Sequence, residues 1–348
     1  MKFGTIEVAH SHKPFIIAEM SGNHNQSLDR AKEIIKAAAE TGAHAVKLQT
    51  YTADTMTINQ RGGLFDITDK KSLWYGRNLY ELYDEAHTPW EWHKPLFDYA
   101  AQLGILCFST PFDESAVDFL ESLNAPFYKI ASFENTDHPL LKKVAQTKKP
   151  VIMSTGAANL NEIIEAVRVL KDNGCKDLVL LKCTSTYPST PENTNLVTIP
   201  VLQQIFPDCM IGLSDHTMGI GVSVSSVALG VRVIEKHFTL NRADGGVDSA
   251  FSMEPAEMKA LVVESERAFL ALGNVQLDIQ AAEAKSRQFK RSIYVVKNIK
   301  TGERFTKENI RVIRPGDGLE PKHYETALST TAKKDLKQGT PLTLHDLS

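Results

Sequence analysis

Charged, hydroxyl and imidazole side chains that could bind or react with a substrate stand at the ends of eight short apolar runs. A buried strand often carries a hydroxyl at one end that only satisfies a nearby backbone group, so any one such residue is weak evidence. Polar groups after all eight runs together predict an active site. They are Glu19, Lys47, Gln49, Ser109, Thr110, Lys129, Ser132, Ser154, Thr155, Thr184, Ser185, Ser214, Asp215, His216, Glu235 and His237.

Two lysines belong to this set. Lys47 and Lys129, with four or five hydroxyls around them, predict a cradle for a small anion. A lysine ammonium is a compact point charge that suits phosphate, and Ser and Thr hydroxyls fill the remaining acceptor sites. Two alternatives stay open. Each lysine could pair with a carboxylate such as Glu19 or Glu235, or one lysine could form a Schiff base with a carbonyl substrate.

Two histidines, His216 and His237, end the seventh and eighth runs. Two neighbouring neutral imidazoles are the start of a divalent metal site. With only two strong protein ligands, water and substrate oxygens would complete the shell, which favours an open, six-coordinate ion such as Mn²⁺ or Mg²⁺ over structural zinc. The alternative is a pair of acid–base or hydrogen-bonding histidines without metal.

The elements that must position these residues alternate along the chain. The apolar runs 15–20, 44–49, 105–110, 127–132, 150–155, 178–183, 209–214 and 231–236 are typical of parallel strands covered on both faces. Amphipathic patterns between them predict helices, the first starting after Ser27 and ending at Gly42. Eight such units favour a (β/α)8 barrel over an open sheet, and no glycine-rich dinucleotide fingerprint follows the first run. A barrel would bring the carboxyl ends of all eight strands to one face.

Two segments depart from the repeat. Residues 50–89 form a long connection that carries Trp74 and several tyrosines, and connections of this length are commonly functional. After Gly273 the chain becomes polar and then turns to short β-like runs, SIYVVKNI, RFTKENIRVIRPG and TPLTLHDL. We expect a barrel over 1–275, a linker over 276–289 and a small, mostly β domain over 290–348. A core this small is only marginally stable by itself, so we expect the domain to pack against the barrel or against another subunit.

Composition bounds the function classes. The chain has 348 residues, 42% of them hydrophobic and 23% charged, which excludes a disordered, collagen-like or disulfide-stapled protein. The formal net charge of −3 argues against a dedicated nucleic-acid binder. No apolar run is long enough for a membrane span, and the first residues lack the apolar core of a signal peptide. Four cysteines without a CxxC pair indicate a reducing cytoplasm.

The charge is unevenly distributed. Residues 290–348 contain 12 Lys and Arg and 7 Asp and Glu, a net charge of +5, which leaves −8 for residues 1–289. Opposite net charges favour docking of the small domain over a barrel mouth, its own or a partner's. They would also add positive potential for a multiply charged anion.

At these residues the sequence resembles the sialic acid synthase family, the phosphoenolpyruvate-condensing nonulosonate synthases. The matching stretches follow family order over nearly the whole chain. They are 16-IIAEMSGNHN-25, 46-VKLQTY-51, 109-STPFD-113, 128-YKIAS-132, 153-MSTG-156, 182-KCTSTYP-188, 213-LSDHT-217, 235-EKHFTL-240 and 314-RPGDG-318. Residues from about 290 onward resemble the family's antifreeze-like (SAF) domain. The resemblance implies a (β/α)8 TIM barrel followed by a small SAF domain.

The resemblance also implies a reaction. The enol carbon of phosphoenolpyruvate attacks the aldehyde of an open-chain N-acetylated amino sugar, water adds to C2, and phosphate leaves with C–O cleavage. Glu19 matches the glutamate that manages the attacking water, a general-base task. The other matches are Lys47, Thr110, Lys129, Ser132, Ser154, Ser185 and Ser214 for phosphoenolpyruvate, Gln49, Tyr187 and Asp248 for the sugar, and His216 and His237 for a Lewis-acid metal. Mn²⁺ is the expected ion, with Mg²⁺ or Co²⁺ as alternatives.

Arg314 is expected to act across subunits. In the family an arginine of the SAF domain reaches into the active site of the partner subunit of a domain-swapped dimer. Arg314, in the stretch RPGDG, fits that arginine, and its charge would suit an acyl carbonyl or carboxylate. The resemblance therefore implies a domain-swapped homodimer.

Two local departures bear on the sugar. Ser185 stands where some N-acetylneuraminate-making members have asparagine, and 246-GVDS-249 stands where they tend to read GPDH. The GVDSAFS form resembles the pseudaminic acid synthases, whose sugar is 2,4-diacetamido-2,4,6-trideoxy-altrose. N-acetylneuraminate and legionaminate synthases are the close alternatives. A Schiff-base barrel aldolase and a non-catalytic carbohydrate-binding module are the distant ones.

Overall fold

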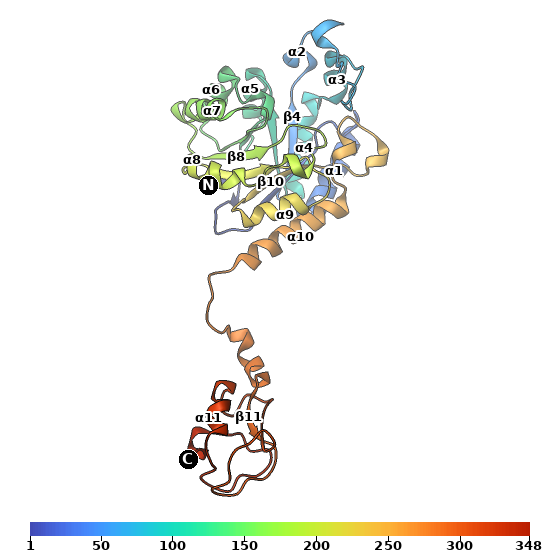
Figure 1. The fold of residues 1–348 in the computed structure, drawn as a ribbon. Coiled ribbons are helices and arrows are strands. Elements are labelled where there is room, and N and C mark those ends of the chain that lie inside the picture. Colours follow the sequence, from blue (N-terminus) through green and yellow to red (C-terminus); the bar gives the residue numbers. More distant parts are fainter. The chain divides into compact units, whose positions relative to one another are not determined.

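The computed structural model describes residues 1–348, which divide into two compact units, Met1–Gly273 and Asn274–Ser348. The first unit is a closed barrel of eight parallel strands in the order β10-β3-β4-β5-β6-β7-β8-β9 (Figure 1). All eight predicted strands are confirmed. They are β3 (Phe15–Glu19), β4 (Ala45–Thr50), β5 (Leu106–Pro111), β6 (Tyr128–Ile130), β7 (Val151–Ser154), β8 (Leu178–Cys183), β9 (Met210–Ser214) and β10 (Val233–His237).

Helices surround the barrel, and each larger one buries an apolar face against the strands. They are α1 (Leu28–Thr41), α4 (Trp90–Gln102), α5 (Glu114–Ser122), α6 (His138–Gln146), α7 (Leu160–Asp172), α8 (Thr198–Ile205), α9 (Gly221–Ala228) and α10 (Pro255–Leu272). The expected ends of α1 are confirmed. Ser27 accepts a hydrogen bond from Arg30 N at the N-cap, and Gly42 closes the helix at φ 85°.

The sequence patterns did not predict helices α8 and α9. Pro200 lies inside α8, and α9 is rich in Ser, Val and Gly, all of which have lower helix propensity than alanine. Both helices nevertheless bury side chains, Ile199 and Leu202 in α8 and Val227 in α9. Packing against the barrel therefore outweighs weak local propensity in these two elements.

The N-terminal residues fill the amino end of the barrel. A short antiparallel pair, β1 (Lys2–Phe3) and β2 (Ile6–Glu7), precedes the first barrel strand. Phe3 is fully buried, with its ring 4.5 Å from that of Phe127 and 5.2 Å from that of Phe15, centroid to centroid. Because these aromatic rings occupy the barrel interior at one end, open space for a substrate remains at the other.

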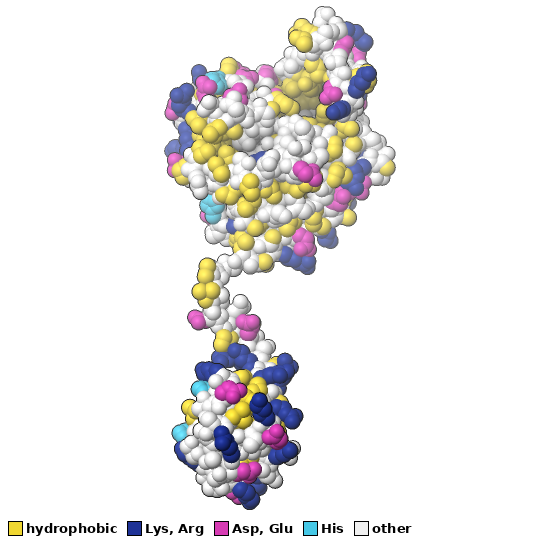
Figure 2. Space-filling view, viewed as in Figure 1, with side chains coloured by type: hydrophobic (Ala, Val, Ile, Leu, Met, Phe, Trp, Pro, Cys, Tyr) yellow, Lys and Arg dark blue, Asp and Glu magenta, His cyan; other side chains and the backbone are white.

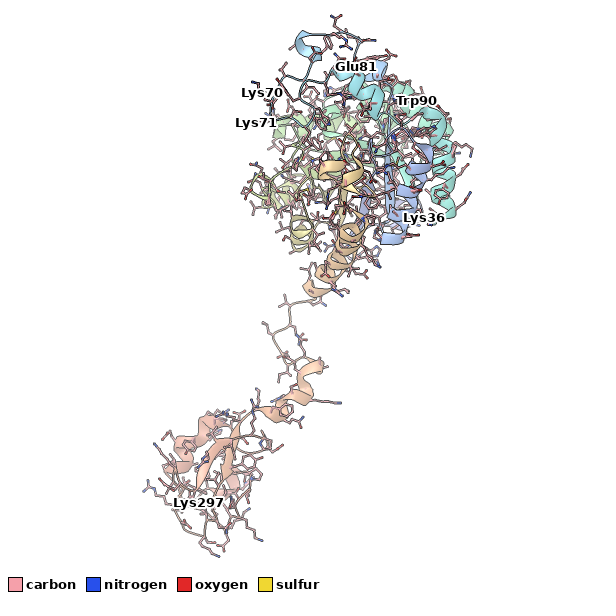
Figure 3. The ribbon with its side chains drawn as sticks, turned by 90° about the vertical axis from the view of Figure 1, so that its right-hand side faces the viewer. Lys36, Lys70, Lys71, Glu81, Trp90 and Lys297 are labelled. Carbon is pink, nitrogen blue, oxygen red and sulfur yellow. The ribbon has the colours of Figure 1, made fainter.

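The long connection after β4 is a structured segment rather than a loose loop. It contains α2 (Ala53–Met56), a 3-10 turn (Gly63–Phe65) and α3 (Leu79–Ala86). Figure 1 shows α2 and α3 beyond the barrel strands, and Figure 3 places Lys70 and Lys71 at the outer edge of this segment. Buried Asn78 caps α3 and donates from its Nδ2 to backbone oxygens of Gln60 and Phe65.

The second unit has its own small core. Strands β11 (Ser292–Val295) and β12 (Ile310–Ile313) pair antiparallel, and α11 (Tyr324–Leu328) follows. The core includes Ile293, Val295, Ile299, Phe305, Ile310 and Leu342. The third β-like run, TPLTLHDL, forms no strand; it supplies an isolated bridge from Pro341 to Tyr294 and a 3-10 turn, Leu344–Asp346. Figure 2 shows Lys and Arg side chains over much of the visible face of this unit.

Between Gly273 and β11 the chain is exposed along its whole length and contains a 3-10 helix, Ala281–Phe289. The sequence predicted a linker or an exposed helix here. None of the helices in either unit combines the length and the hydropathy that a membrane span needs.

Candidate active site

A cavity of about 460 Å³ opens at the carboxyl ends of the barrel strands. It brings together nearly all of the predicted site residues, from Glu19 on β3 to His237 on β10. The lining contains Glu19, Lys47, Gln49, Lys129, Ser132, Ser154, Ser185, Tyr187, Ser214, His216, His237 and Asp248. Thr110 lies next to this lining and accepts a hydrogen bond from Lys47 Nζ at 3.1 Å. Arg314 belongs to the second unit, where its side chain is exposed.

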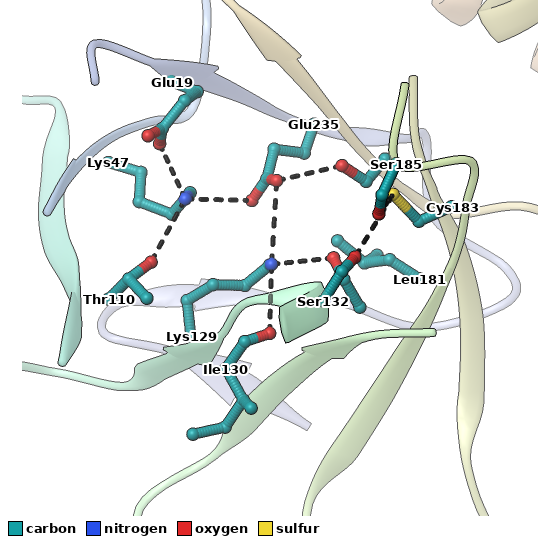
Figure 4. A network of polar contacts seen from close by, with 12 residues as sticks. Glu19, Lys47, Thr110, Lys129, Ile130, Ser132, Leu181, Cys183, Ser185 and Glu235 are labelled. Atoms are coloured by element: carbon teal, nitrogen blue, oxygen red, sulfur yellow. Dashed lines mark hydrogen bonds and ion pairs between the residues drawn. The ribbon is translucent and has the colours of Figure 1, made fainter. Parts of the chain in front are cut away.

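A network of alternating charges lies at the bottom of the cavity (Figure 4). Lys47 Nζ lies 2.8 Å from Glu19 Oε2 and 3.8 Å from Glu235 Oε2. Lys129 Nζ lies 3.8 Å from Glu235 Oε1 and donates to Ser154 Oγ at 2.7 Å. The salt-bridge alternative for the lysines is therefore realised, yet both ammonium groups also face the cavity. Each ammonium group has three donors and uses two of them. Lys47 bonds to Glu19 and Thr110, and Lys129 bonds to Ser154 and the carbonyl oxygen of Ile130, so one donor of each remains for a bound anion.

The two lysines differ in their surroundings. Burial lowers the pKa of Lys129, and Glu235 only partly compensates. Burial acts on Lys47 in the same way, but the carboxylates of Glu19 and Glu235 outweigh it and raise the pKa of Lys47. Lys129 donates to the Ser154 hydroxyl at the end of β7, and a methyl group at Gly156 would overlap the hydroxyl oxygens of Ser132 and Ser185. Glycine at position 156 thus keeps this part of the cradle open.

Glu19 is a carboxyl group poised between its two protonation states. Burial raises its pKa to about 7, against the opposing effect of Lys47. Gln49 Nε2 donates to its Oε1 at 2.9 Å and fixes its orientation. A carboxylate whose pKa lies near neutrality suits proton transfer to and from a reacting water.

The histidine pair lies on the opposite side of the cavity, with ring centroids 5.4 Å apart. Nδ1 of His216 donates to the carbonyl oxygen of Thr184 at 2.9 Å, so Nε2 is the nitrogen left for a ligand. Burial lowers the pKa of His216, but the neighbouring Cys183 thiol outweighs burial and raises it. Burial holds the pKa of His237 well below its ordinary value, and its buried Nδ1 has no hydrogen-bond partner. A neutral imidazole with an unpartnered nitrogen fits a metal ligand. No third His, Cys, Asp or Glu completes a metal-binding group, so the pair fits only an open site.

The remaining predicted residues line the outer part of the cavity. The Tyr187 ring lies 4.4 Å from that of His216 and 6.0 Å from that of Trp74, centroid to centroid. Asp248 accepts a hydrogen bond from Ser21, and burial raises the pKa of its carboxyl group. Gln49, Tyr187 and Asp248 therefore lie within one cavity, although they come from three different parts of the chain.

Several strand-end residues have structural roles instead. Asp215 lies away from the cavity lining, where it accepts from Lys236 Nζ at 3.0 Å and from Ser223 Oγ at 2.6 Å. Ser109 bonds to Thr50, and Thr155 donates to a backbone carbonyl. Hydroxyls of this kind satisfy nearby polar groups, which is why a single strand-end hydroxyl is weak evidence for an active site.

Other cavity residues gave little or no signal in the sequence. Glu235, a strand-end residue expected to pair with a lysine, lies between both lysines and accepts a hydrogen bond from Ser214 at 3.1 Å. Glu134 lies in a 3-10 turn after β6, where burial raises its pKa to about 7. Burial raises the pKa of the Cys183 thiol, but His216 outweighs it, leaving a value of about 7. Ser21 gave no signal in the sequence. The 50–89 connection was expected to be functional, and its Trp74 lines the cavity together with apolar residues that the sequence did not single out.

Residues 34–277 match the NeuB family, and residues 290–348 match the SAF domain. The chain belongs to the NeuB family. It is 47% identical, over 95% of both chains, to a pseudaminic acid synthase of Campylobacter jejuni, and 45% identical, over 96% and 98%, to one of Helicobacter pylori. Among solved structures, the N-acetylneuraminic acid synthetase of Leptospira borgpetersenii is similar, with a TM-score of 0.73 and 32% identity over 82% of this chain and 94% of that one.

Membership in the NeuB family confirms the resemblance drawn from the motifs, and the barrel followed by a SAF domain confirms the predicted fold class. The named NeuB-family relatives are synthases, which places the chain among enzymes that form carbon–carbon bonds. A non-catalytic carbohydrate-binding module is therefore not the function of this chain.

Proposed function

We propose that this chain acts as a pseudaminic acid synthase. It condenses phosphoenolpyruvate with 2,4-diacetamido-2,4,6-trideoxy-altrose and water, and it releases phosphate and a nine-carbon 2-keto acid. The observation that carries the proposal is a single cavity in which two buried lysines lie opposite a histidine pair. The pseudaminic acid synthases among its relatives favour this choice within the family.

Phosphoenolpyruvate binds at the lysine side. Its phosphate and carboxylate carry up to three negative charges, which need cationic and hydroxyl donors in a buried site. Lys47 and Lys129 supply the cationic donors. The hydroxyl donors are Thr110, Ser132, Ser154, Ser185 and Ser214. Because Lys129 bonds to Ser154 and Lys47 to Thr110, the ammonium groups are already oriented before the anion arrives.

The sugar binds with its aldehyde at the histidine side. Carbon C3 of phosphoenolpyruvate forms the new bond to the aldehyde carbon, and water adds to C2 as Glu19 takes its proton. The C2–oxygen bond to phosphate then breaks. His216 and His237 would hold a divalent ion, Mn²⁺ in the first place and Mg²⁺ or Co²⁺ as alternatives, which supplies Lewis-acid polarisation of the aldehyde oxygen. Gln49, Tyr187 and Asp248 hold the sugar.

A phosphate-release assay with a panel of amino sugars tests the function. Phosphoenolpyruvate is supplied with the 2,4-diacetamido-trideoxy sugar, with N-acetylmannosamine and with the legionaminate precursor. The expected result is fastest release with the first sugar. Preference for N-acetylmannosamine would overturn the pseudaminate assignment, and a covalent adduct trapped with borohydride and pyruvate would favour a Schiff-base aldolase.

The dimer is part of the proposal. We divide the chain into a barrel at 1–275, a linker at 276–289 and a SAF domain at 290–348, and we place Arg314 of one subunit in the site of the partner subunit. The exposed linker and the opposite net charges of the two domains, −8 and +5, support such an exchange.

Subunit complementation tests the exchange. Arg314→Ala and Glu19→Gln should each abolish most turnover, because each removes one group from every site. In mixed dimers one site combines an intact barrel with an intact Arg314, so coexpression should restore about a quarter of wild-type activity. No recovery on mixing, or full turnover of Arg314→Ala alone, would contradict the role of Arg314 across subunits.

A further inference from the structure

One wall of the cavity is apolar and comes from a single segment of the chain. Met56, Ile67, Trp74, Leu79 and Leu82 line it, all from the connection between β4 and α4. We call these five residues the apolar wall. The opposite side consists of the charged and hydroxyl groups at the strand ends. The cavity is therefore divided between a polar side suited to phosphoenolpyruvate and a mainly apolar side, to which the same connection adds the two tyrosines Tyr51 and Tyr83.

The apolar wall is held in place by backbone hydrogen bonds. Ile67 N donates to Arg77 O at 2.9 Å, and Gly76 N donates to Ile67 O at 2.8 Å. Trp74 Nε1 donates to the carbonyl oxygen of Val247 at 3.0 Å, which ties the wall to the residue before Asp248. With its one N–H engaged in this way, Trp74 presents only its ring to the cavity.

The position of the wall matches the end of the sugar that is remote from the aldehyde. The ring of Tyr187 lies between that of His216, 4.4 Å away, and that of Trp74, 6.0 Å away. An open-chain sugar whose aldehyde faces the histidine pair therefore extends past Tyr187 toward the apolar wall. Its C6 methyl group is the part of the sugar farthest along the chain from the aldehyde, so it reaches that side, whereas the acetamido group on C2 stays beside the aldehyde.

We propose that the apolar wall is the specificity-determining subsite for the C6 methyl group of the sugar and selects a 6-deoxy sugar over one with a 6-hydroxyl. The inference rests on the proposed function. A hydroxyl placed against Ile67, Leu79 and Leu82 would lose its water and gain no partner, whereas a methyl group gains contact. An apolar pocket discriminates against an added hydroxyl by about a hundredfold.

The test compares two sugars that differ only at C6, the 2,4-diacetamido-2,4,6-trideoxy sugar and its 6-hydroxy counterpart, in the full chain. Wild type should prefer the deoxy sugar by about a hundredfold in kcat/KM. Ile67→Asn and Leu79→Asn, which offer an amide to the hydroxyl, should each reduce that preference at least tenfold. The KM for phosphoenolpyruvate should stay unchanged, because it binds on the opposite side.

Two controls separate specificity from structure. Leu64 lies in the same segment but is 94% exposed and outside the cavity lining, so Leu64→Asn should keep the wild-type preference. Ile67→Val retains an apolar surface and should also keep it. If the Asn variants lose activity equally on both sugars, or keep the wild-type preference for the deoxy sugar, the inference is wrong while the proposed function stands. A wild type inactive with the deoxy sugar overturns the proposed function and the inference with it.

Discussion

Replacing Glu19 by glutamine should reduce turnover by about a hundredfold or more, the scale of general acid–base catalysis, while phosphoenolpyruvate binding is retained. Glutamine preserves the size of the side chain but cannot take a proton from water. Lys47 and Lys129, which hold the anion in the proposed mechanism, keep Glu235 as a partner. Single-turnover phosphate release measures the chemical step, and equilibrium titration with phosphoenolpyruvate measures binding.

The pH profile of the wild type gives an independent reading of the same group. Burial raises the pKa of Glu19 to about 7, and the base must be deprotonated to act. Turnover should therefore be low well below pH 7 and rise through about pH 7. The Glu19→Gln variant should lack this rise.

Glu134 is the matched control for Glu19, because burial raises its pKa to about 7 as well and it lines the same cavity. Glu134→Gln should keep the rise in turnover through about pH 7. If the rise disappears in Glu134→Gln and persists in Glu19→Gln, the base is Glu134 and the role assigned to Glu19 is wrong. Near-normal turnover of Glu19→Gln would also remove Glu19 from the mechanism.

Replacing His237 by alanine should lower turnover by roughly a thousandfold, since Lewis-acid stabilisation of an alkoxide contributes several kcal/mol. The variant should also bind Mn²⁺ far more weakly, because only His216 remains. Mn²⁺ titration monitored by electron paramagnetic resonance measures the metal directly, without reference to activity. Chelator should inactivate the wild type, and added Mn²⁺ should restore it.

The control for this prediction is His10→Ala. His10 is exposed and lies on the N-terminal segment, away from the cavity lining, so its removal should change neither Mn²⁺ binding nor turnover. Undiminished Mn²⁺ affinity in His237→Ala would exclude this histidine as a ligand. Full turnover of the chelated wild type would exclude a metal requirement.

The part of the candidate site that is formed by residues at the strand ends could be predicted from the sequence. The eight apolar runs all form barrel strands, because continuous hydrophobic runs are stable only when covered on both faces. A closed parallel barrel then brings Glu19, Lys47, Lys129 and His237 to one face, whatever their separation in the chain. The motifs around these residues identified the family.

Side-chain direction at the strand ends was decided by the tertiary structure. Asp215 and Ser214 are neighbours in the sequence, yet Ser214 lines the cavity and Asp215 pairs with Lys236 outside it. Successive residues of a strand point to opposite faces. The sequence of a polar strand end does not show which of its side chains points into the barrel and which points out.

By itself, the sequence determined the strand order, the identity of the charged and hydroxyl residues and the family, because these depend on hydrophobic runs and local motifs. The tertiary structure decided which residues from distant segments of the chain face these charged and hydroxyl residues. Trp74 donates a hydrogen bond to Val247, and Ser21 donates one to Asp248, although the partners of each pair lie far apart in the sequence. The apolar wall has no periodicity of its own, because its residues come from turns and short helices whose packing depends on the completed barrel. Its role is visible only where it faces the polar strand ends.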